Sequence, residues 1–544
     1  MTRPTALVLL ARDINPDQVH DFLNPELKNI GDPYCLSGTR EASARLWQAI
    51  QEGHRIIIHG DYDTDGITAS ALLAWVLRKN GGNVGCYLPH RIDDGYGLTA
   101  ESIAKASAGN CDLLLTVDCG ITSHEAILAA QDINLDLIIT DHHTPGPETL
   151  NALAVVDPKL PGSPREIQEL AGVGVAFKVA HAFLKYGREM GFGGEDTDLR
   201  QCLDLVALGT VADIVPLLHE NRILVKHGLS VLAQQQRPGI HALCDIAGVG
   251  ENLETADITY RLAPRINATG RMGDPTDGLK LLEADNMVDA SALAKVLDCR
   301  NKERQSIEEA VVQDAENQIA RRYNLESARS IVVWNEGWHQ GVVGIVASRL
   351  TRRYHRPSVV LTRDPSGQYT GSARSIRMLN LVNVLDECAD TLIRFGGHAM
   401  AAGLSLNEEM LEVFCQQFDV AVQKVLGIES MKPMLNVCGQ VLLDELDDVF
   451  FQELVMLEPF GHGNPEPVFL ARGIYCERRN LAGRNHTRGI IRDENGARMQ
   501  FIAFGRLPDD FPPQPWDIVF SPHINRFNGT AVPQLRLHDV QTMK

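Results

Sequence analysis

The sequence predicts an α/β protein in which a parallel-sheet domain is joined by a long helix to a smaller α/β domain, followed by a C-terminal β-barrel. Between residues 41 and 215, short apolar runs alternate with helical patterns, which is typical of a parallel sheet covered by helices. A stretch free of glycine and proline and rich in helix formers runs from Asp285 to Tyr323. Short β-like runs separated by turn residues follow residue 434, which favours a small barrel, and an OB-fold is the preferred form.

Length and composition indicate a globular protein of several domains. A chain of 544 residues is too long to fold around a single hydrophobic core. A composition of 44% hydrophobic and 22% charged residues excludes a disordered chain. The eleven cysteines form no CxxC pair and no secretory signal is visible, so we expect reduced thiols in the cytoplasm. We expect no membrane span, because no apolar run has the necessary length.

The net charge of −19 disfavours unspecific binding to nucleic acid. Two segments of the sequence are nevertheless locally basic. Residues 349–377 hold seven arginines and one acid, and residues 472–498 hold seven arginines and three acids. Each segment is either a solvated face or a phosphate-binding surface. The barrel region also contains the aromatic residues Tyr475, Phe501, Phe504 and Phe527. Their rings either stack on bases or fill the core of the barrel.

Acidic residues follow the four apolar runs of the first domain. These runs are RIIIH (55–59), LLLTV (113–117), LIIT (137–140) and ALAVV, and the acids that follow them are Asp61, Asp118, Asp141 and Asp157. The carboxyl ends of parallel strands share one edge of a sheet, where ligands bind. We therefore expect the acids to meet in space, although Asp157, before a proline, is also explained as a turn residue.

Three short motifs at these strand ends supply carboxylates and imidazoles. They are HGDYDTDG (59–66), VDCG (117–120) and TDHH (140–143). Two unit charges about 4 Å apart repel by roughly 4 kcal/mol at an effective dielectric near 20, so such a cluster needs cations. Oxygen ligands with imidazoles favour Mn²⁺, and Mg²⁺ less strongly. A pair of such ions is suited to phosphoester hydrolysis.

The three motifs resemble motifs I to III of the DHH phosphoesterase superfamily, and LDLVALGTVADIVPL (203–217) resembles motif IV of its RecJ family. Other RecJ-like segments are YLPHRIDDGYGL, LAGVGVAFK, APRINATGR, GWHQGVVGIVASRL, GSARSI, FGGHAMAAG and LEPFGHGNPEPVF. The resemblance implies five parts: an N-terminal segment (1–40), a DHH catalytic domain (41–240), a connecting region with the long helix (241–324), a DHHA1 domain (325–430) and an OB-fold-like nucleic-acid-binding domain (431–544).

The resemblance also implies roles for individual residues. It makes Asp118, His142 and His143 catalytic, with His143 facing the substrate phosphate, and it gives Asp61 and Asp141 the task of orienting ligands. The implied ligands of two ions are His59, Asp63, Asp65, Asp118, His142 and Asp204. The residues alone do not distinguish Asp204 from Asp213, because both lie in one apolar segment. The implied substrate-binding residues are Arg91, Arg265, Ser372, Arg374 and His398.

The implied activity is 5′→3′ hydrolysis of single-stranded DNA to 5′-mononucleotides by a two-metal-ion mechanism, in DNA repair and recombination. The implied partners are single-stranded DNA, a single-stranded-DNA-binding protein and a helicase, and the implied state is a monomer. One alternative is a DHH phosphodiesterase acting on small oligonucleotides, cyclic dinucleotides or pyrophosphate. Another is an inactive scaffold, which would have lost metal ligands. No GxxxxGK[ST] segment is present, so Gly172 and Gly174 are expected to form the start of a helix.

Overall fold

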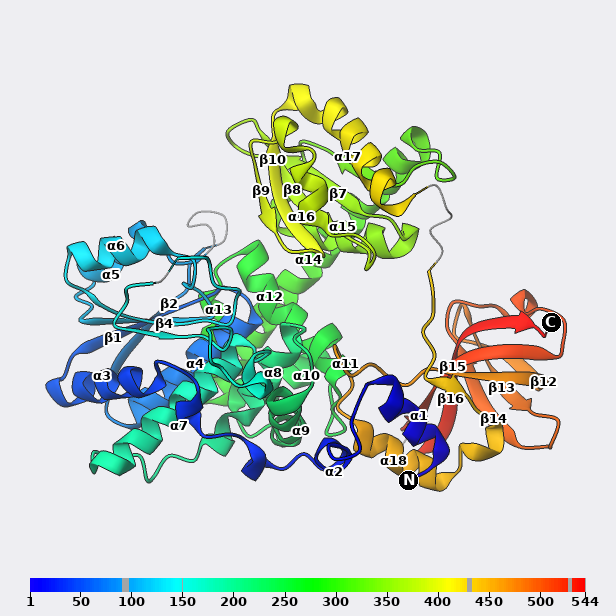
Figure 1. Ribbon diagram of the computed structural model, residues 1–544, viewed down its shortest axis with the longest axis horizontal. Helices are drawn as coiled ribbons and strands as arrows, with labels where there is room; N and C mark the ends of the chain where they lie inside the picture. Colours follow the sequence, from blue (N-terminus) through cyan, green and yellow to red (C-terminus); the bar gives the residue numbers. More distant parts are fainter. Residues whose placement is uncertain (91–96, 149, 428–432, 527–530, 544) are drawn as a thin grey trace. The chain divides into compact units, whose positions relative to one another are not determined.

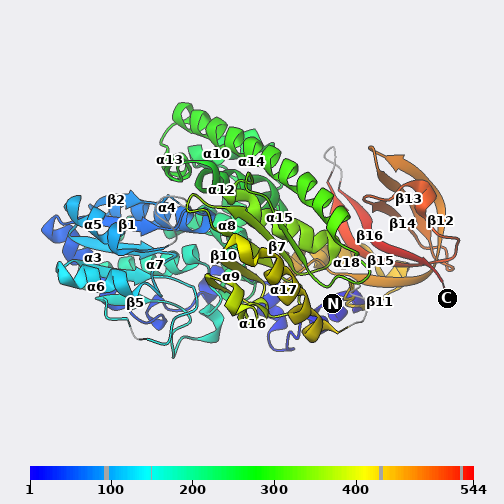
Figure 2. The same cartoon turned by 90° about the horizontal axis from the view of Figure 1, so that it is seen from above.

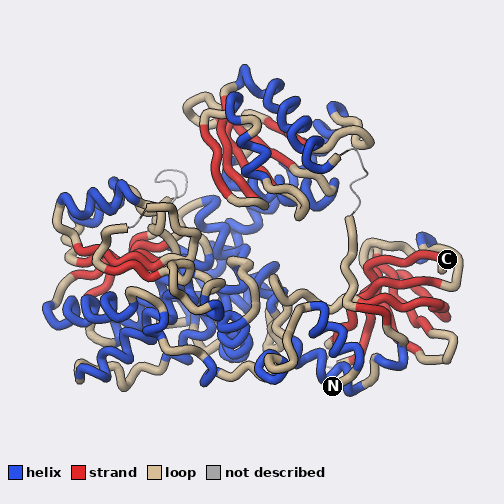
Figure 3. The backbone as a smooth tube through the Cα atoms, viewed as in Figure 1, coloured by secondary structure: helices blue, strands red, loops and turns tan. Residues whose placement is uncertain are grey.

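The computed structural model describes residues 1–90, 97–148, 150–427, 433–526 and 531–543. The chain divides into two compact units. The first contains Met1–Pro264, Pro275–Ala294 and Leu435–Lys544, and the second contains Arg265–Asp274 and Lys295–Met434. Strands are red in Figure 3, and they form three sheets. Among the described helices, none combines the length and the apolar character that a membrane span requires.

The first sheet has five parallel strands in the order β2-β1-β3-β4-β5. Their bounds are β1 Arg55–Gly60, β2 Asn83–Tyr87, β3 Leu113–Val117, β4 Asp136–Thr140 and β5 Ala154–Val156. All five residues of β3 are buried, as expected for a central strand covered on both faces. The structure confirms the four predicted strands. It adds β2 at the edge, where Gly85 and Cys86 interrupt the apolar run that would have revealed a strand.

Helices cover both faces of this sheet (Figure 1). One face carries α3 (Thr39–Glu52), α4 (Thr64–Lys79) and α7 (Gly172–Met190), and the other carries α5 (Ala100–Ala108) and α6 (His124–Asp132). Ile103 and Ile127 of the second pair pack on Leu114 and Ile139 of the strands. A doubly covered parallel sheet leaves its strand ends as the accessible edge.

Further helices follow the sheet along the chain. They are α8 (Leu203–Ala212), α9 (His219–Ala233), α10 (Pro238–Ala247), α11 (Thr255–Asp257), α12 (Ala263–Met272), α13 (Thr276–Glu283) and α14 (Met287–Arg322). The last has 36 residues and begins in the first unit and continues in the second. It is the long green helix of Figure 2, and it confirms the predicted connecting helix.

The second unit contains a mixed sheet in the order β6-β7-β8-β10-β9. Its strands are β6 Ile331–Trp334, β7 Ser358–Arg363, β8 Tyr369–Arg374, β9 Arg394–Gly397 and β10 Ala401–Leu406. Helix α15 (Gln340–Tyr354) packs on one face through Val346 and Leu350. Helices α16 (Leu381–Asp386) and α17 (Leu411–Leu426) cover the other face, where Phe414 and Phe418 are fully buried. The predicted smaller α/β domain is therefore confirmed.

The C-terminal strands close into a barrel, because β15 pairs with both β16 and β12. The strands are β12 Phe469–Ala482, β13 His486–Arg492, β14 Arg498–Ala503, β15 Trp516–Asn525 and β16 Val532–Thr542, and β11 (Gly439–Gln440) adds to β12. Trp516 and Phe501 lie in the core, whereas Phe504 is 55% exposed and Tyr475 is half-buried. Phe527 lies outside the described residues. The structure therefore assigns Phe501 to the barrel core and leaves Phe504 exposed.

The N-terminal segment belongs to the same core as the barrel. Helices α1 (Arg3–Ala11) and α2 (Val19–Leu23) contribute Val8 and Phe22, which pack with Phe450 of α18 (Asp448–Leu457). The Thr2 hydroxyl also donates a hydrogen bond to Glu453 at 2.7 Å. No local pattern predicts this association, because more than four hundred residues separate the two segments.

A buried ion pair ties α7 to α9. Lys178 Nζ lies 3.0 Å from Glu220 Oε2, and the two side chains are 0% and 5% exposed. Lys178 also donates to the Gly31 carbonyl, and the Gly31 amide donates to Glu220 Oε1, both at 2.9 Å. We expect Lys178→Met to destabilise the fold by about 3–5 kcal/mol, because it leaves a buried carboxylate without its counter-charge.

The double variant Lys178→Met/Glu220→Gln is the control for that prediction. It removes both charges and keeps an acceptor for the Gly31 amide, so most of the lost stability should return. Urea unfolding of the purified chain measures both variants. A single variant as stable as the wild type would show that the pair contributes little.

Candidate metal centre

The three predicted motifs meet at the carboxyl edge of the first sheet. His59 on β1 is opposite Thr116 on β3, and Leu115 on β3 is opposite Ile138 on β4. The strands therefore end at the same level, and the residues that follow them are neighbours. Asp65 joins the group from the first turn of α4, and Asp213 from the residue that follows α8.

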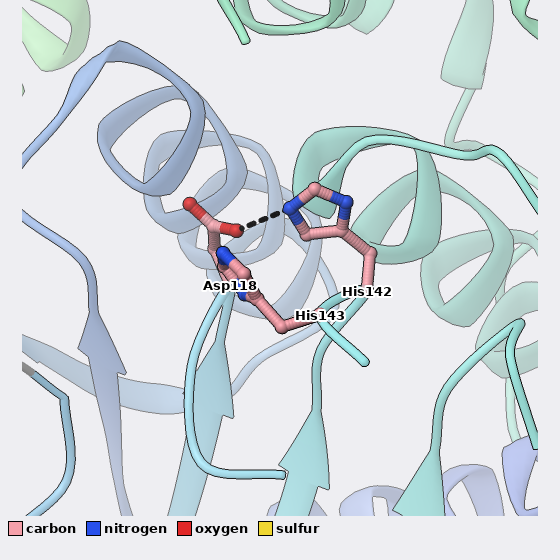
Figure 4. A group of neighbouring side chains, drawn as sticks. All are labelled: Asp118, His142 and His143. Carbon is pink, nitrogen blue, oxygen red and sulfur yellow. Dashed lines mark ion pairs between the residues drawn. The ribbon is translucent and has the colours of Figure 1, made fainter. Parts of the chain in front are cut away.

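Three sets of side chains in the described part of the chain bring their ligand atoms within 4.8 Å of one another. The sets are Asp118 with His142 and His143, Asp65 with His142 and Asp213, and Asp61 with Asp63 and Asp118. Figure 4 shows the first set, in which Asp118 and His142 face each other. Asp118 and His142 each belong to two sets, so the three form one continuous cluster.

Asp118 is at the centre of the cluster. It directly follows β3, is 2% exposed and has a left-handed backbone with φ of 62°, a conformation that Asp tolerates better than most residues. Its Oδ1 lies 3.0 Å from His142 Nε2. Neither atom makes a well-formed hydrogen bond to any described residue, so both are oriented as ligands of a shared cation would be.

The electrostatics of the cluster favour bound cations. Burial, and after it the neighbouring carboxylates, raise the pKa of Asp118 well above its usual range. The same causes raise the pKa of Asp65 to about 7 and that of Asp213 to about 9. Buried acids this close cannot all be ionised unless positive charge is present. Carboxylates with imidazoles form the donor set of Mn²⁺ and, with fewer imidazoles, of Mg²⁺, so these residues fit a pair of divalent ions.

His59 lies beside these sets on β1. It is 1% exposed, its Nδ1 lies 3.6 Å from Cys119 Sγ, and its ring is 5.3 Å from that of Tyr87. The three sets do not include it. Asp63 has a second task as the cap of α4, because its Oδ1 accepts hydrogen bonds from the amides of Asp65 and Gly66.

Asp141 holds His143. Its Oδ1 lies 2.7 Å from His143 Nδ1 and accepts from the amides of His142 and His143, and its Oδ2 accepts from the Ile121 amide. Burial lowers the pKa of His143, but its hydrogen bond to Asp141 and the nearby acids raise it to about 9. The His143 side chain remains 36% exposed, with its Nδ1 edge turned toward Asp141.

The structure places Asp204 away from the cluster, so the expectation that Asp204 joins the ligands is wrong. The three sets found among the described residues omit it, and its Oδ2 instead pairs with Arg237 Nε at 3.0 Å. Asp204 lies in the first turn of α8 and Asp213 follows the last. Nine residues of helix separate the two by about 13 Å, at ~1.5 Å per residue, so only one of them can reach the strand ends.

Asp213 takes the place that was expected for Asp204. Its Oδ2 lies 3.6 Å from His142 Nε2. The sequence shows that Asp213 is present but does not reveal the direction in which α8 runs. That direction decides which end of the helix meets the cluster.

Three of the predicted substrate-binding residues lie in the sheet of the second unit or in one of its turns. Ser372 and Arg374 are on β8, where Gly403 and Ala401 of β10 face them, and His398 is exposed between β9 and β10. Arg374 donates to the Ser372 hydroxyl. Arg265, on α12, pairs with Asp298 at 2.9 Å. Arg91 lies outside the described residues.

Comparisons with known proteins match all three domains. Residues 55–210 match the DHH family, N-terminal domain. Residues 328–424 match the DHHA1 domain, and residues 439–539 match the RecJ OB domain. The predicted parallel-sheet, smaller α/β and barrel domains therefore correspond to these three families, while their outer boundaries stay predictions.

Relatives match nearly the whole length of this chain, although the chain spans less than two thirds of the first of them. The single-stranded-DNA-specific exonuclease RecJ of Bacillus subtilis (strain 168) is 38% identical over 530 residues, which cover 95% of this chain and 65% of that protein. The protein of the same name from Escherichia coli (strain K12) is 36% identical over 526 residues, which cover 93% and 90%. The crystal structure of RecJ in complex with Mn²⁺ from Thermus thermophilus superposes with a TM-score of 0.83 at 30% identity, covering 100% of this chain and 76% of that one. With these matches along its whole length, the chain belongs to the RecJ family.

Proposed function

We propose that this chain is a metal-dependent exonuclease that hydrolyses single-stranded DNA to 5′-mononucleotides with the help of two Mn²⁺ or Mg²⁺ ions. The observation that carries the proposal is the buried cluster in which Asp118 and His142 are each shared between two sets of ligand atoms. The names of the relatives and the RecJ OB domain support single-stranded DNA as the substrate.

The residues that would hold the ions are His59, Asp61, Asp63, Asp65, Asp118, His142 and Asp213. When bound, the two ions would act as Lewis acids toward the phosphoryl oxygens and stabilise the negative charge that develops on them. His143, held by Asp141 at its Nδ1, is proposed to bind the scissile phosphate through its exposed ring. Asp141 holds that ring in position through its Oδ1, which contacts His143 Nδ1. The Asp141 carboxylate is itself fixed, because its Oδ2 accepts a hydrogen bond from the Ile121 amide.

The substrate is proposed to contact the second unit and the barrel as well. Arg374 and Ser372 grip a phosphate, since a guanidinium binds phosphate bidentately, and His398 and Arg265 hold the backbone or the 5′ end. Phe504 and the barrel arginines provide a stacking and phosphate-binding surface. We further propose 5′→3′ polarity, a monomer in the cytoplasm that acts in DNA repair and recombination, and a single-stranded-DNA-binding protein and a helicase as partners.

A substrate panel tests the proposal. The chain is incubated with 5′-phosphorylated single-stranded DNA, duplex DNA, a dinucleotide and pyrophosphate, each with Mn²⁺ or with chelator. We expect mononucleotide release from the single strand with Mn²⁺, little from the duplex, and none with chelator. Preferential cleavage of the dinucleotide or of pyrophosphate would instead identify a small-substrate phosphodiesterase, and cleavage of the single strand in chelator would remove the need for metal.

A further inference from the structure

The turn that begins α7, Leu170–Val173, contacts two members of the metal cluster, Asp65 and Asp118, although it belongs to none of the ligand motifs. The Gly172 amide donates to Asp65 Oδ2 at 2.7 Å, and the Val173 amide donates to Asp65 Oδ1 at 2.9 Å. Both carboxylate oxygens of Asp65 are thus held by backbone amides of a single turn.

Gly172 also sets the position of Asp118. A Cβ at residue 172 would lie 2.7 Å from the Cβ, the Cγ and the Oδ1 of Asp118, well inside van der Waals contact. The backbone of Gly172 is helical, so a larger residue is excluded by lack of space and not by backbone conformation. Asp118 has little room to move away, because it is 2% exposed and follows a fully buried strand.

Helix α7 is held firmly behind this turn. Lys178, two turns further along the helix, is in the buried ion pair with Glu220 and also binds the Gly31 carbonyl. Phe183 stacks on Trp47 of α3, with ring centroids 4.5 Å apart and an interplanar angle of 7°. A helix fixed at these points does not retreat to make room for a side chain at residue 172.

We propose that the Leu170–Val173 turn is a positioning element for the metal centre, with Gly172 as its positioning residue. The turn fixes the carboxylates of Asp65 and Asp118 in the arrangement that the ions require. The inference rests on the proposed function, because it assumes that these two side chains bind divalent ions.

Gly172→Ala tests the role of the turn, and Gly174→Ala is its matched control. The three atoms nearest to a Cβ at residue 174 all belong to the side chain of Leu170, the nearest being Cδ2 at 3.1 Å, and that flexible side chain can yield. We expect Gly172→Ala to weaken Mn²⁺ binding by at least about tenfold, as loss of groups that orient ligands commonly does, and Gly174→Ala to change it by less than about threefold. Isothermal titration with Mn²⁺ measures both.

The titration separates the two ideas. A wild-type chain that binds no Mn²⁺ overturns the proposed function. A wild-type chain that binds Mn²⁺ and a folded Gly172→Ala variant that binds it equally well overturn only the role of the turn.

A second comparison covers the case in which Gly172→Ala folds poorly, and it needs neither metal nor activity. Asp118→Gly removes the atoms that the new Cβ would meet and suits the positive φ at residue 118. We expect Gly172→Ala to lower the melting temperature strongly in the wild-type background and only slightly in the Asp118→Gly background. An equal loss in both backgrounds would show that Asp118 is not what Gly172 accommodates.

Discussion

Asp118→Asn is expected to lower the rate of single-stranded DNA cleavage by at least about 10³-fold. Asp118 is shared between two sets of ligand atoms, so one substitution weakens both ion sites. Loss of about 4 kcal/mol of transition-state stabilisation corresponds to a thousandfold loss of rate, at about 1.4 kcal/mol for each factor of ten. Asn is preferred to Ala here because it also tolerates the left-handed backbone at this residue. Steady-state release of mononucleotides measures the rate.

Two controls show whether the loss is specific. Binding of a fluorescent single strand should stay within about twofold of wild type, because the proposed grip residues, such as Ser372 and Arg374, lie elsewhere in the chain. Without metal, the variant should melt at the same or a higher temperature than wild type, since burial and neighbouring acids raise the pKa of Asp118 and its charge therefore destabilises the fold at neutral pH. Loss of binding with residual cleavage would contradict the assigned role.

Asp213→Asn is expected to reduce cleavage, whereas Asp204→Asn is expected mainly to reduce stability. Asp213 lies in the cluster, 3.6 Å from His142, so its substitution should reduce cleavage by about 10²–10³-fold, as expected for a lost metal ligand. Asp204 pairs with Arg237, and both side chains are largely buried. Its substitution should leave cleavage within about threefold and cost about 1–3 kcal/mol of stability, because the guanidinium loses a charged hydrogen-bond partner.

Cleavage assays and urea unfolding of the two variants distinguish these effects. Retained cleavage in Asp213→Asn together with loss in a folded Asp204→Asn variant would restore Asp204 as the ligand and contradict the geometry described above.

The sequence predicted much of the sheet because the relevant signals are local. Apolar runs such as LLLTV mark buried strands, and parallel pairing places the residues that follow them, such as Asp118 and Asp141, along one edge whatever the loops do. The edge strand β2 was missed because Gly85 and Cys86 weaken its apolar pattern. The association of Val8 with the barrel core was missed because nothing local specifies a partner hundreds of residues away.

The same limit explains the error at motif IV. Asp204 and Asp213 occupy equally apolar surroundings in the sequence, and only the packing of α8 decides which of them reaches His142. The role of Gly172 was hidden for a related reason. Its neighbour Asp118 comes from another strand, so the sequence showed a glycine at the start of a helix but not the carboxylate lying against it.

The number of divalent ions that the chain binds is the most direct test of the central claim, which is that carboxylates and imidazoles from separate strands share two ions. Calorimetric titration of the metal-free chain with Mn²⁺ gives that number without any assay of activity. We predict two ions per chain in the wild type and weakened binding of both in Asp118→Asn. A wild-type chain that binds no Mn²⁺, or an Asp118→Asn variant that binds two ions with unchanged affinity, would contradict the account.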